Sequence, residues 1–494
     1  MNFSVNLTTL KRADVVVVGG GAAGTCAAIA AARGGASTLL VEQYGCLGGM
    51  MTLGLVMPLS AQASKSGLSF GGILHEMLDR IVGLTKEYCG GEGKPHHLFS
   101  SPHVMKYVLL DTAVNSGVDI LLHTTLVDVV RVGNRIEKLV VLSKSGLGVI
   151  EGGVFIDATG DGDLLFRAGE DYVLGSEAGV MDRLTGAGLN KVHMEERAYG
   201  NYEQDGLLQP VTMMFTMGGV DVERARPLVN RRLRFADVGL TREEFEKLPY
   251  ANTPGFVVEG DELPLPQGRV LFFQNRRPGE VVVNMTRVTG INGADALELT
   301  QGEIVAQRQV FHVVDFLHRF IPGFERAYLL ETAGILGVRE TRRLVGRHVL
   351  TGGEAIDCAA FPDVVAHGSY IIDIHDPQGR RKAIGGPIRG DCYDIPYRSL
   401  VPKTVENLLV AGRCISSDHV AHSSTRIQGT CMLTGQAAGT AAAMARSLRG
   451  GVAEVDVVAL QEALLQAGVQ LFRRSGEAGK RVATVAAAAD VADL

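Results

Sequence analysis

The segment over residues 13–42 constrains the fold more than any other part of the sequence, and it reads ADVVVVGGGAAGTCAAIAAARGGASTLLVE. Its run Val15 to Val18 predicts a strand buried on both faces of a parallel sheet, since such strands are nearly continuous apolar, β-branched stretches. Small residues over 22–32 then predict a helix that ends at the glycine pair 34–35, and 37–41 predicts a second strand. This order of strand, helix and strand is that of a dinucleotide-binding unit.

Three glycines and one carboxylate occupy the positions at which such a unit holds its ligand. Gly19, Gly21 and Gly24 form the spacing G-x-G-x-x-G directly after the first strand, and Glu42 follows the second strand. The first glycine permits a tight turn, the second lets a pyrophosphate approach the backbone, and the third lets helix and strand pack closely. The acidic residue can accept the ribose hydroxyls. We therefore expect a dinucleotide at Gly19, Gly21, Ala23, Gly24 and Glu42.

Three later segments favour FAD as that dinucleotide. A second glycine cluster follows Glu42 and indicates backbone that approaches a large flat group such as an isoalloxazine. The segment 154–163, VFIDATGDGD, predicts a strand that ends beside the adenine half. The segment 407–413 predicts a short buried strand, and 426–446 predicts a helix whose N-terminal partial positive charge would stabilise a reduced flavin. The further residues expected at FAD are Gly48, Gly49, Thr159, Gly160, Gly412, Arg413 and Gly435.

Together these segments resemble the family of FAD-dependent oxidoreductases related to the flavoprotein subunits of fumarate reductase and succinate dehydrogenase. The resemblance rests on GGGAAG near residue 20 and on NLLVAGRCISSDHVAHSSTRIQGTCMLTGQAAGTAAA at 407–443. The blocks NMTRVTGINGAD (284–295), GVRETRRLVG (337–346) and YDIPYRSLVPK (393–403) resemble a less characterised branch of that family.

The resemblance implies an α/β protein with a discontinuous, Rossmann-like FAD-binding domain and an inserted α+β substrate or cap domain. We place the FAD-binding domain at 1–170 and 391–450, the inserted domain at 171–390, and a C-terminal helix and tail at 451–494. Local patterns predict helices at 70–83, 102–116, 222–234, 242–247, 301–319 and 455–467. They predict strands at 118–122, 126–132, 210–220 and 281–288, and a hairpin of 138–143 with 149–155.

Composition and cysteine usage exclude several other classes. The 494 residues are too many for one ordinary core, and a net charge of −6 gives no basic surface for nucleic acid. No apolar stretch is long enough for a membrane span, and the first residues lack the apolar core of a secretory signal. The seven cysteines include no C-x-x-C pair, so we expect no metal site, and free thiols indicate a cytoplasmic protein.

The first candidate for chemistry is the segment His422-Ser423-Ser424-Thr425-Arg426. It is similar to a His-Gly-x-Asn-Arg element of fumarate reductase-like enzymes, and the resemblance implies that Arg426 faces the substrate with His422 nearby. Ser423 and Thr425 depart from that element. Arginine suits a carboxylate because its planar fork donates two parallel hydrogen bonds. The alternative is that both residues satisfy loop carbonyls at the entrance of the following helix.

Two other segments compete with it. If 337–343 is a strand, Arg339 and Arg343 share one face and could clamp an anion, although a structural ion network with Glu340 is the commoner fate of such a run. In the segment Asp373-Ile374-His375, a histidine beside a carboxylate could donate or accept a proton, or it could be a hydrogen-bonded spectator.

A fourth candidate block holds Tyr397 and Arg398, which could touch ligand or form a rigid hinge. A lone Cys46 beside the second glycine cluster argues against a dithiol mechanism. The absence of a second G-x-G-x-x-G in the sequence argues against an NAD(P)H-dependent disulfide reductase.

These observations predict an FAD-dependent oxidoreductase that transfers a hydride between flavin and a small polar or anionic organic substrate, with Arg426, His422, Arg339 and His375 as catalytic candidates. One alternative is a flavoenzyme that catalyses a hydroxylation or a net non-redox step. Another is the flavoprotein subunit of an electron-transfer complex. The sequence leaves open a homo-oligomer or a redox partner, and it names neither the substrate nor the direction of the reaction.

Overall fold

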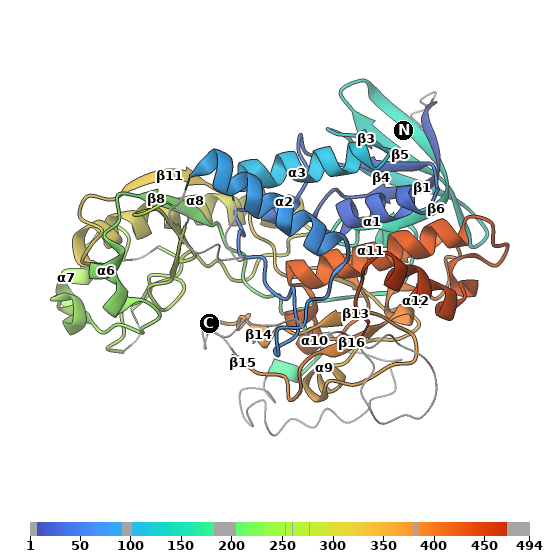
Figure 1. Ribbon diagram of the computed structural model, residues 1–494. Helices are drawn as coiled ribbons and strands as arrows, with labels where there is room; N and C mark the ends of the chain where they lie inside the picture. The colour runs from blue at the N-terminus through green and yellow to red at the C-terminus, as the bar shows by residue number, and fades with distance from the viewer. Residues whose placement is uncertain are drawn as a thin grey trace, which may run out of the picture.

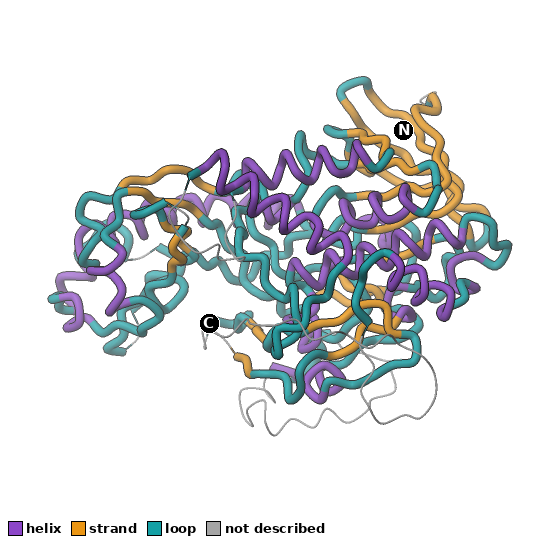
Figure 2. Tube along the Cα trace, viewed as in Figure 1, coloured by secondary structure: helices purple, strands orange, loops and turns teal. Residues whose placement is uncertain are grey.

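The computed structural model describes residues 7–90, 101–181, 204–251, 253–258, 260–275, 277–379 and 384–471. Within these residues the chain forms a seven-stranded sheet, a four-stranded sheet and three two-stranded ribbons. Segments from the start of the chain, in blue, and from its end, in red, lie side by side around the large sheet (Figure 1). Figure 2 shows, in purple, the helices that pack beside the large sheet. The predicted Rossmann-like α/β fold with a discontinuous first unit is confirmed.

The large sheet has the order β3-β2-β1-β6-β5-β4, and β17 pairs with the second half of β6. Its strands are β1 (Thr8–Val18), β2 (Thr38–Val41), β3 (Val118–Leu121), β4 (Thr125–Val132), β5 (Arg135–Ser143), β6 (Gly146–Asp157) and β17 (Leu408–Val410). Strands β3, β2, β1, β6 and β17 run parallel to one another. Strand β5 is antiparallel to both of its neighbours, β6 and β4, so β4 runs in the same direction as β6.

The register of this sheet brings four strand ends to one level. Val18 lies opposite both Val41 and Asp157, and Asp157 lies opposite Val410. One strand, β6, contains both the strand predicted at 149–155 as half of a hairpin and the strand predicted before Ala-Thr-Gly. The loops that follow these four ends must gather at a single edge, which is where open α/β sheets bind ligands.

Two helices of small residues, α1 (Ala22–Arg33) and α11 (Gln428–Ala445), pack against each other beside the sheet. A Cβ on Gly435 would lie 2.1 Å from the carbonyl oxygen of Ala23, and one on Gly439 would lie 2.1 Å from that of Ala27. The two backbones touch, so a side chain at either glycine would force them apart. The helix predicted at 426–446 is confirmed as α11, within two residues of its expected bounds, and α10 (His419–Thr425) precedes it as a separate helix that the sequence did not predict.

The smaller sheet is antiparallel, with the order β11-β8-β10-β9. Its strands are β8 (Phe215–Gly218), β9 (Phe272–Gln274), β10 (Val281–Val283) and β11 (Tyr328–Thr332), and the long helix α8 (Ala296–Phe320) belongs to the same unit. Buried residues between Val211 and Val338 form its core. Buried residues between Leu350 and Ile388 pack instead in one cluster with α1 and α11.

Several predicted elements are shorter in the structure. The strands predicted at 210–220 and 281–288 extend only over β8 and β10. The helix predicted at 222–234 is wrong in length, since α6 (Val222–Ala225) gives way to a 3-10 turn that contains Pro227, which cannot continue an α-helix. The other predicted helices are confirmed within a few residues of their expected bounds.

Further helices are α2 (Gly72–Cys89), α3 (Pro102–Asn115), α4 (Asp163–Arg167), α7 (Arg242–Glu246), α9 (Gly352–Asp357) and α12 (Val457–Gln466). Further strands are β7 (Tyr172–Leu174), β12 (Arg342–Leu344), β13 (Val364–Gly368), β14 (Ile372–Ile374), β15 (Ile384–Gly386) and β16 (Tyr393–Pro396). Short 3-10 helices are η1 (Gly49–Met51), η3 (Arg226–Leu228), η4 (Phe235–Val238), η5 (Tyr397–Leu400), η6 (Gly412–Cys414) and η7 (Gly451–Glu454).

Candidate cofactor and substrate site

The turn from β1 into α1 has room for a ligand at one glycine and none at the other two. Gly19 has φ +98°, and a Cβ there would lie 2.5 Å from the carbonyl oxygen of Ala158. A Cβ on Gly24 would lie 1.7 Å from the carbonyl oxygen of Gly19. A Cβ on Gly21 would meet no heavy atom within 4 Å in the part of the chain that the structure describes.

The same turn exposes the N-terminus of α1. Gly21 is the residue that caps this helix, and it offers no side chain to accept from the first N–H groups. The first turn also holds no acidic residue. Free N–H groups and the partial positive charge at a helix N-terminus make an anion-binding position, and Gly21 leaves the space in front of it open.

Glu42 lies at the end of β2, directly beside this turn. Its Oε2 accepts a hydrogen bond of 2.5 Å from the N–H of Gly20, and its Oε1 accepts one of 2.8 Å from the N–H of Tyr44. Burial raises the pKa of Glu42, while these backbone donors favour the ionised form. The carboxylate is therefore fixed in place by the backbone at the position expected for a ribose contact.

The second glycine cluster folds back onto the first turn. The N–H of Gly48 donates to the carbonyl oxygen of Gly20 at 2.8 Å, and Gly48 has φ +104°. A Cβ on Gly49 would come within 3.3 Å of the Cα of Gly21. These two predicted glycines thus lie beside the open space at Gly21, which larger residues would narrow.

The ends of β6 and β17 form the next part of the same edge. Asp157 is fully buried and accepts from the N–H and the hydroxyl of Thr159, at 3.0 and 2.7 Å. Burial raises the pKa of Asp157 to about 6 against the effect of these donors. Arg413, in η6 after β17, pairs with Asp161 at 2.7 Å, so an ion pair joins the loops that follow the two strands.

The predicted residues of this pair of loops lie close together. Gly412 has φ +81° and starts the turn that carries Arg413. A Cβ on Gly160 would lie 2.9 Å from Nη2 of Arg413. Gly435 lies in the contact between α1 and α11, where it packs against Ala23 as Gly412 also does.

A cluster of charged side chains lies where α10 ends and β14 passes. Nη2 of Arg426 donates to the carbonyl oxygen of Asp373 at 3.0 Å and lies 3.9 Å from its carboxylate. Nε2 of His375 lies 3.5 Å from the same carboxylate. Arg339 and Arg287 are close enough to alter the pKa values of this group. We call Arg287, Arg339, Arg426, Asp373 and His375 the arginine cluster.

The arginine cluster has more positive than negative charge. Burial lowers the pKa of Arg339 to about 9, and the charges of Arg426 and Arg287 act in the same direction. Burial also lowers the pKa of Arg426 and that of Arg287, the latter to about 10. Burial would raise the pKa of Asp373, but His375, Arg426 and Arg339 hold it well below its usual range. Burial and Arg339 lower the pKa of His375 to about 3, so its ring is neutral near pH 7.

Some buried side-chain nitrogens of this region have no hydrogen-bond partner among the described residues. They include Nε of Arg426, Nδ1 of His422, Nδ1 of His375 and the amide nitrogen Nε2 of Gln209. The backbone N–H of His375 donates to Oε1 of Gln209 at 3.1 Å, so the latter two residues are neighbours. Buried donors without partners are unusual in folded proteins and indicate a position for a ligand or an ordered water.

The segment before β8, in the unit of the smaller sheet, holds the side chain of Arg339. Its Nη1 donates to the carbonyl oxygen of Pro210 at 2.5 Å and to the hydroxyl of Thr212 at 2.7 Å. Its own carbonyl oxygen lies 3.1 Å from Nε2 of His422. His422 therefore contacts the backbone of Arg339, and burial keeps the pKa of His422 well below its ordinary value.

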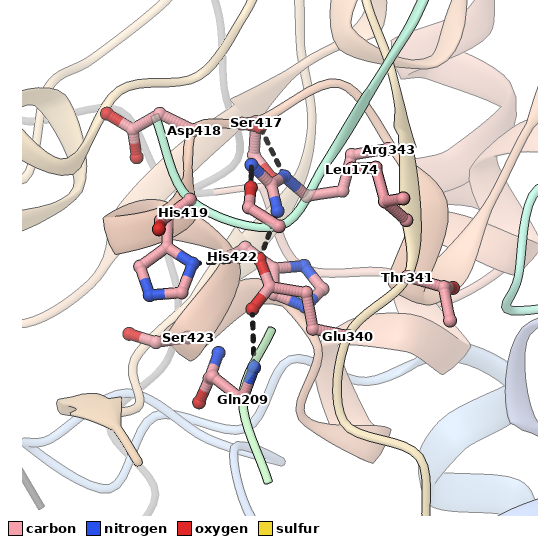
Figure 3. Close-up of polar contacts among 12 residues, drawn as sticks. Leu174, Gln209, Glu340, Thr341, Arg343, Ser417, Asp418, His419, His422 and Ser423 are labelled. Atoms are coloured by element: carbon pink, nitrogen blue, oxygen red, sulfur yellow. Dashed lines mark hydrogen bonds and ion pairs between the residues drawn. The ribbon is translucent and has the colours of Figure 1, made fainter. Parts of the chain in front are cut away.

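A buried ion network lies behind these residues, and Figure 3 shows Glu340 at its centre between Arg343 and Gln209. Arg343 pairs with Glu340 and, at 3.0 Å, with Glu177, and all of its side chain is buried. Nδ1 of His419 lies 2.8 Å from the Glu340 carboxylate. The strand considered over 337–343 forms only in part, since β12 begins at Arg342, and Arg343 belongs to the structural ion network that was the alternative to a clamp with Arg339.

The side chains of Tyr397 and Arg398, from the fourth candidate block, lie outside the arginine cluster. The hydroxyl of Tyr397 donates to the carbonyl oxygen of Val452 at 2.7 Å, and Arg398 pairs with Asp363 at 2.9 Å. Both side chains are engaged in contacts within the fold. Cys46 is half-buried, and all seven cysteines are free thiols.

The model of one protein family matches almost the whole chain. That family is described as FAD dependent oxidoreductase, and the match covers residues 14–464. The chain belongs to the FAD-dependent oxidoreductase family. No sequence among the curated proteins matches it.

Solved structures of other proteins show distant likeness to this FAD-dependent oxidoreductase. A geranylgeranyl bacteriochlorophyll reductase-like protein from Thermoplasma acidophilum has 12% identity and a TM-score of 0.40, with 92% of this chain and 83% of that chain covered. The aromatic hydroxylase CabE from angucycline biosynthesis has 13% identity and a TM-score of 0.41, covering 91% and 64%. The p-nitrophenol 4-monooxygenase PnpA from Pseudomonas putida has 11% identity and a TM-score of 0.38, covering 92% and 84%.

The cofactor of this FAD-dependent oxidoreductase fits the residues at the sheet edge. The open space at Gly21 and the uncapped N-terminus of α1 suit the pyrophosphate, and Glu42 suits the adenosine ribose. Along the described residues we find no group of three or more His, Cys, Asp or Glu that could hold a metal ion. None of the helices described is long and apolar enough to cross a membrane.

Sequence reasoning missed two residues that lie at the candidate site, Arg287 and Gln209. Arg287 follows β10 and donates through Nη2 to the carbonyl oxygen of Asp376 at 2.9 Å. A signal for it was present, since Arg287 falls in the NMTRVTGINGAD block that carried the family resemblance. Gln209 had no such signal, because nothing in its neighbourhood distinguishes it from an ordinary loop residue.

Proposed function

We propose that this FAD-dependent oxidoreductase transfers a hydride between FAD and a small organic anion bound at the arginine cluster. The observation that carries the proposal is the excess of positive charge there, where three buried arginines lie near two carboxylates, those of Asp373 and Asp376. An anionic group bound among them would relieve the repulsion from Arg426 and Arg287 that, after burial, lowers the pKa of Arg339. A neutral substrate would leave that repulsion in place.

The proposed substrate position adjoins the proposed cofactor position. Arg413 pairs with Asp161 at the sheet edge, and its charge also contributes to lowering the pKa of Arg426, after burial. Two such charges act on each other over short distances only, because screening weakens the interaction with separation. A substrate held by Arg426 would therefore lie next to the loops that we assign to FAD.

Each residue of the cluster has a proposed role. Arg426 and Arg339 bind the anionic group of the substrate, and Arg426 offers the unpartnered Nε for this purpose. His375, neutral near pH 7, offers Nδ1 as a hydrogen-bond donor or acceptor for a substrate oxygen. Asp373 holds Arg426 and His375 in place and limits the local positive charge. When bound, FAD supplies the two-electron oxidation or reduction.

The test is reduction of the purified holoenzyme by candidate substrates in the absence of oxygen, followed through the loss of the visible absorbance of oxidised flavin. The panel pairs small hydroxy and saturated carboxylic acids with their neutral amides. We expect reduction by a carboxylate and not by its matched amide. The reverse direction is tested by reducing the flavin chemically and adding unsaturated or keto carboxylates, which should reoxidise it.

Two results would contradict the proposal. Equal reaction of acid and amide would show that the cluster does not select an anion. Consumption of oxygen and NAD(P)H with incorporation of an oxygen atom into the substrate would assign the hydroxylase class instead.

A further inference from the structure

The long helix α8 carries an apolar stripe on the side that faces away from its own core. Leu297, Ile304 and Phe311 are 83%, 43% and 62% exposed, and they follow one another at intervals of seven residues. Seven residues make almost two helical turns, so the three side chains lie nearly in line along about 21 Å of the helix. Exposed apolar residues gathered in this way mark an interaction surface more often than singly scattered ones do.

The opposite side of α8 is already used within the molecule. Its buried residues pack in the core of the smaller sheet, and they are Gly302, Val305, Ala306, Gln309, Val310, Val313, Phe316 and Leu317. The stripe therefore has no role in holding α8 on its own unit. In the part of the chain that the structure describes, nothing covers Leu297 or Phe311 enough to bury them.

The stripe is symmetric about its middle residue. Leu297 lies seven residues before Ile304, and Phe311 lies seven residues after it. If a second copy of α8 lies antiparallel with a two-fold axis at Ile304, each Ile304 meets its equivalent and each Leu297 meets the Phe311 of the other copy. One surface patch then serves both sides of the contact, as a two-fold interface requires.

The polar residues beside the stripe favour the antiparallel arrangement. Exposed Gln301 and Arg308 flank Ile304 at three residues before it and four after it. The two-fold axis brings Arg308 of one copy beside Gln301 of the other, whose amide oxygen can accept from a guanidinium. The two Arg308 side chains then lie about 12 Å apart along the helix axis, whereas a parallel pair would place them opposite each other.

We propose that α8 is the interface of a two-fold homodimer, with antiparallel α8 helices in contact through Leu297, Ile304 and Phe311. Stable complexes bury about 800 Å² per partner, and a helix pair in contact over about 21 Å covers less than that. We therefore expect a dissociation constant in the micromolar range, with dimer dominant at about 100 μM protein and monomer at about 0.1 μM.

Analytical ultracentrifugation of the FAD-loaded protein over this concentration range tests the proposal, with Ile304→Glu as the disruptive variant. The axis at residue 304 would place two carboxylates opposite each other, so we expect only monomer. Val132→Glu is the matched control, since Val132 is 60% exposed and lies on β4 of the large sheet rather than on α8, and this variant should dimerise like the natural protein. Flavin absorbance reports that both variants remain folded. A natural protein that is monomeric at about 100 μM overturns the proposal.

Cross-linking distinguishes this arrangement from other dimers. Ile304→Cys should form a disulfide-linked dimer under mild oxidation, whereas Leu297→Cys and Phe311→Cys should do so only when the two variants are mixed. The seven native cysteines are buried or half-buried, and the natural protein oxidised in parallel gives the background. A dimer in which Ile304→Cys does not cross-link, or in which all three variants cross-link alone, contradicts the antiparallel contact.

Discussion

The turn after β1 and the arginine cluster are both candidate binding positions, but they are built from parts that lie at different distances along the chain. The turn takes its glycines and its carboxylate from Gly19 to Glu42, and the backbone itself fixes them. The cluster collects side chains from Arg287 to Arg426, and these come from both the smaller sheet and the helices beside the large one. A local site can be recognised as a motif, whereas an assembled site depends on how two units pack.

The largest effect that separates the two regions should come from Gly24→Val. A Cβ at residue 24 would collide with the carbonyl oxygen of Gly19, at 1.7 Å, so β1 and α1 could not pack. We expect loss of the folded protein, measured as the yield of soluble chain and by circular dichroism. A folded Gly24→Val protein would show that this contact adapts more easily than the geometry implies.

Gly21→Val is the matched variant that should affect FAD and not the fold. A Cβ there meets no described atom within 4 Å, yet it would occupy the space expected for the pyrophosphate. We expect a folded, colourless protein with the circular dichroism of the natural one and no flavin uptake on titration with FAD. Retention of a full complement of flavin would contradict the assignment of this space.

Arg426→Ala should leave FAD bound and lower kcat/KM about a hundredfold, because loss of one charge-assisted donor typically costs about 3 kcal/mol. Arg426→Lys should restore part of the rate, since a point charge cannot reproduce the planar fork. Arg343→Lys, in the buried network behind the site, is a control for structural damage and should lower the melting temperature. Normal turnover of Arg426→Ala would make the residue structural.

Acid should weaken the fold through His375. Its pKa in the folded protein is about 3 against an ordinary value of 6.5, so below pH 6.5 the unfolded chain takes up a proton that the folded one does not. The free energy of unfolding should fall by up to about 1.4 kcal/mol per pH unit from pH 6.5 towards 3, and this contribution should be constant above pH 6.5. Denaturant unfolding across this range should show a shallower slope for His375→Gln. His103→Gln, at an exposed position on α3, should leave it unchanged.

The smallest effect should come from Glu42→Gln. The amide keeps one oxygen to accept from the N–H of Gly20 or from a ribose hydroxyl, but it loses the charge. A hydrogen bond to a charged group contributes about 1.5–3 kcal/mol, and a neutral one about half of this. We expect FAD to bind roughly tenfold more weakly by equilibrium titration, with no change in the arginine cluster. An unchanged affinity would argue that Glu42 only supports the turn.

The difference between the two regions also explains which features of the structure could be predicted from the sequence and which could not. The strand, turn and helix around Gly21 follow from local rules, and so do the family resemblance and the α/β fold. The sequence predicts α11 within two residues but not α10, because that helix has only seven residues and shows no sustained period. Arg339 and Arg343 would share a face only if 337–343 were a strand. The alternative, an ion network with Glu340, is the one that forms, because the buried carboxylates of Glu177 and Glu340 pair with Arg343.

The assignment of the arginine cluster to catalysis stays a prediction, as does the division of the chain at residues 170 and 390. Proximity between Arg287 and Arg426 depends on the packing of one unit on the other, and no spacing in the sequence encodes it. Gln209 illustrates the same limit, since its only distinguishing feature is an amide nitrogen that the fold leaves buried without a described partner.

The close contact of α11 with α1 has a consequence for how the protein folds during its synthesis on the ribosome. Ala23 and Ala27 leave the ribosome early, but the glycines that cover them are translated about 400 residues later, which takes roughly 20–80 s at ordinary elongation rates. During that interval the first strands and α1 have no partner on one side, and their apolar surface is available to other chains. We therefore expect slow or interrupted synthesis to favour aggregation, and nascent chains to require chaperones until residue 445 has emerged.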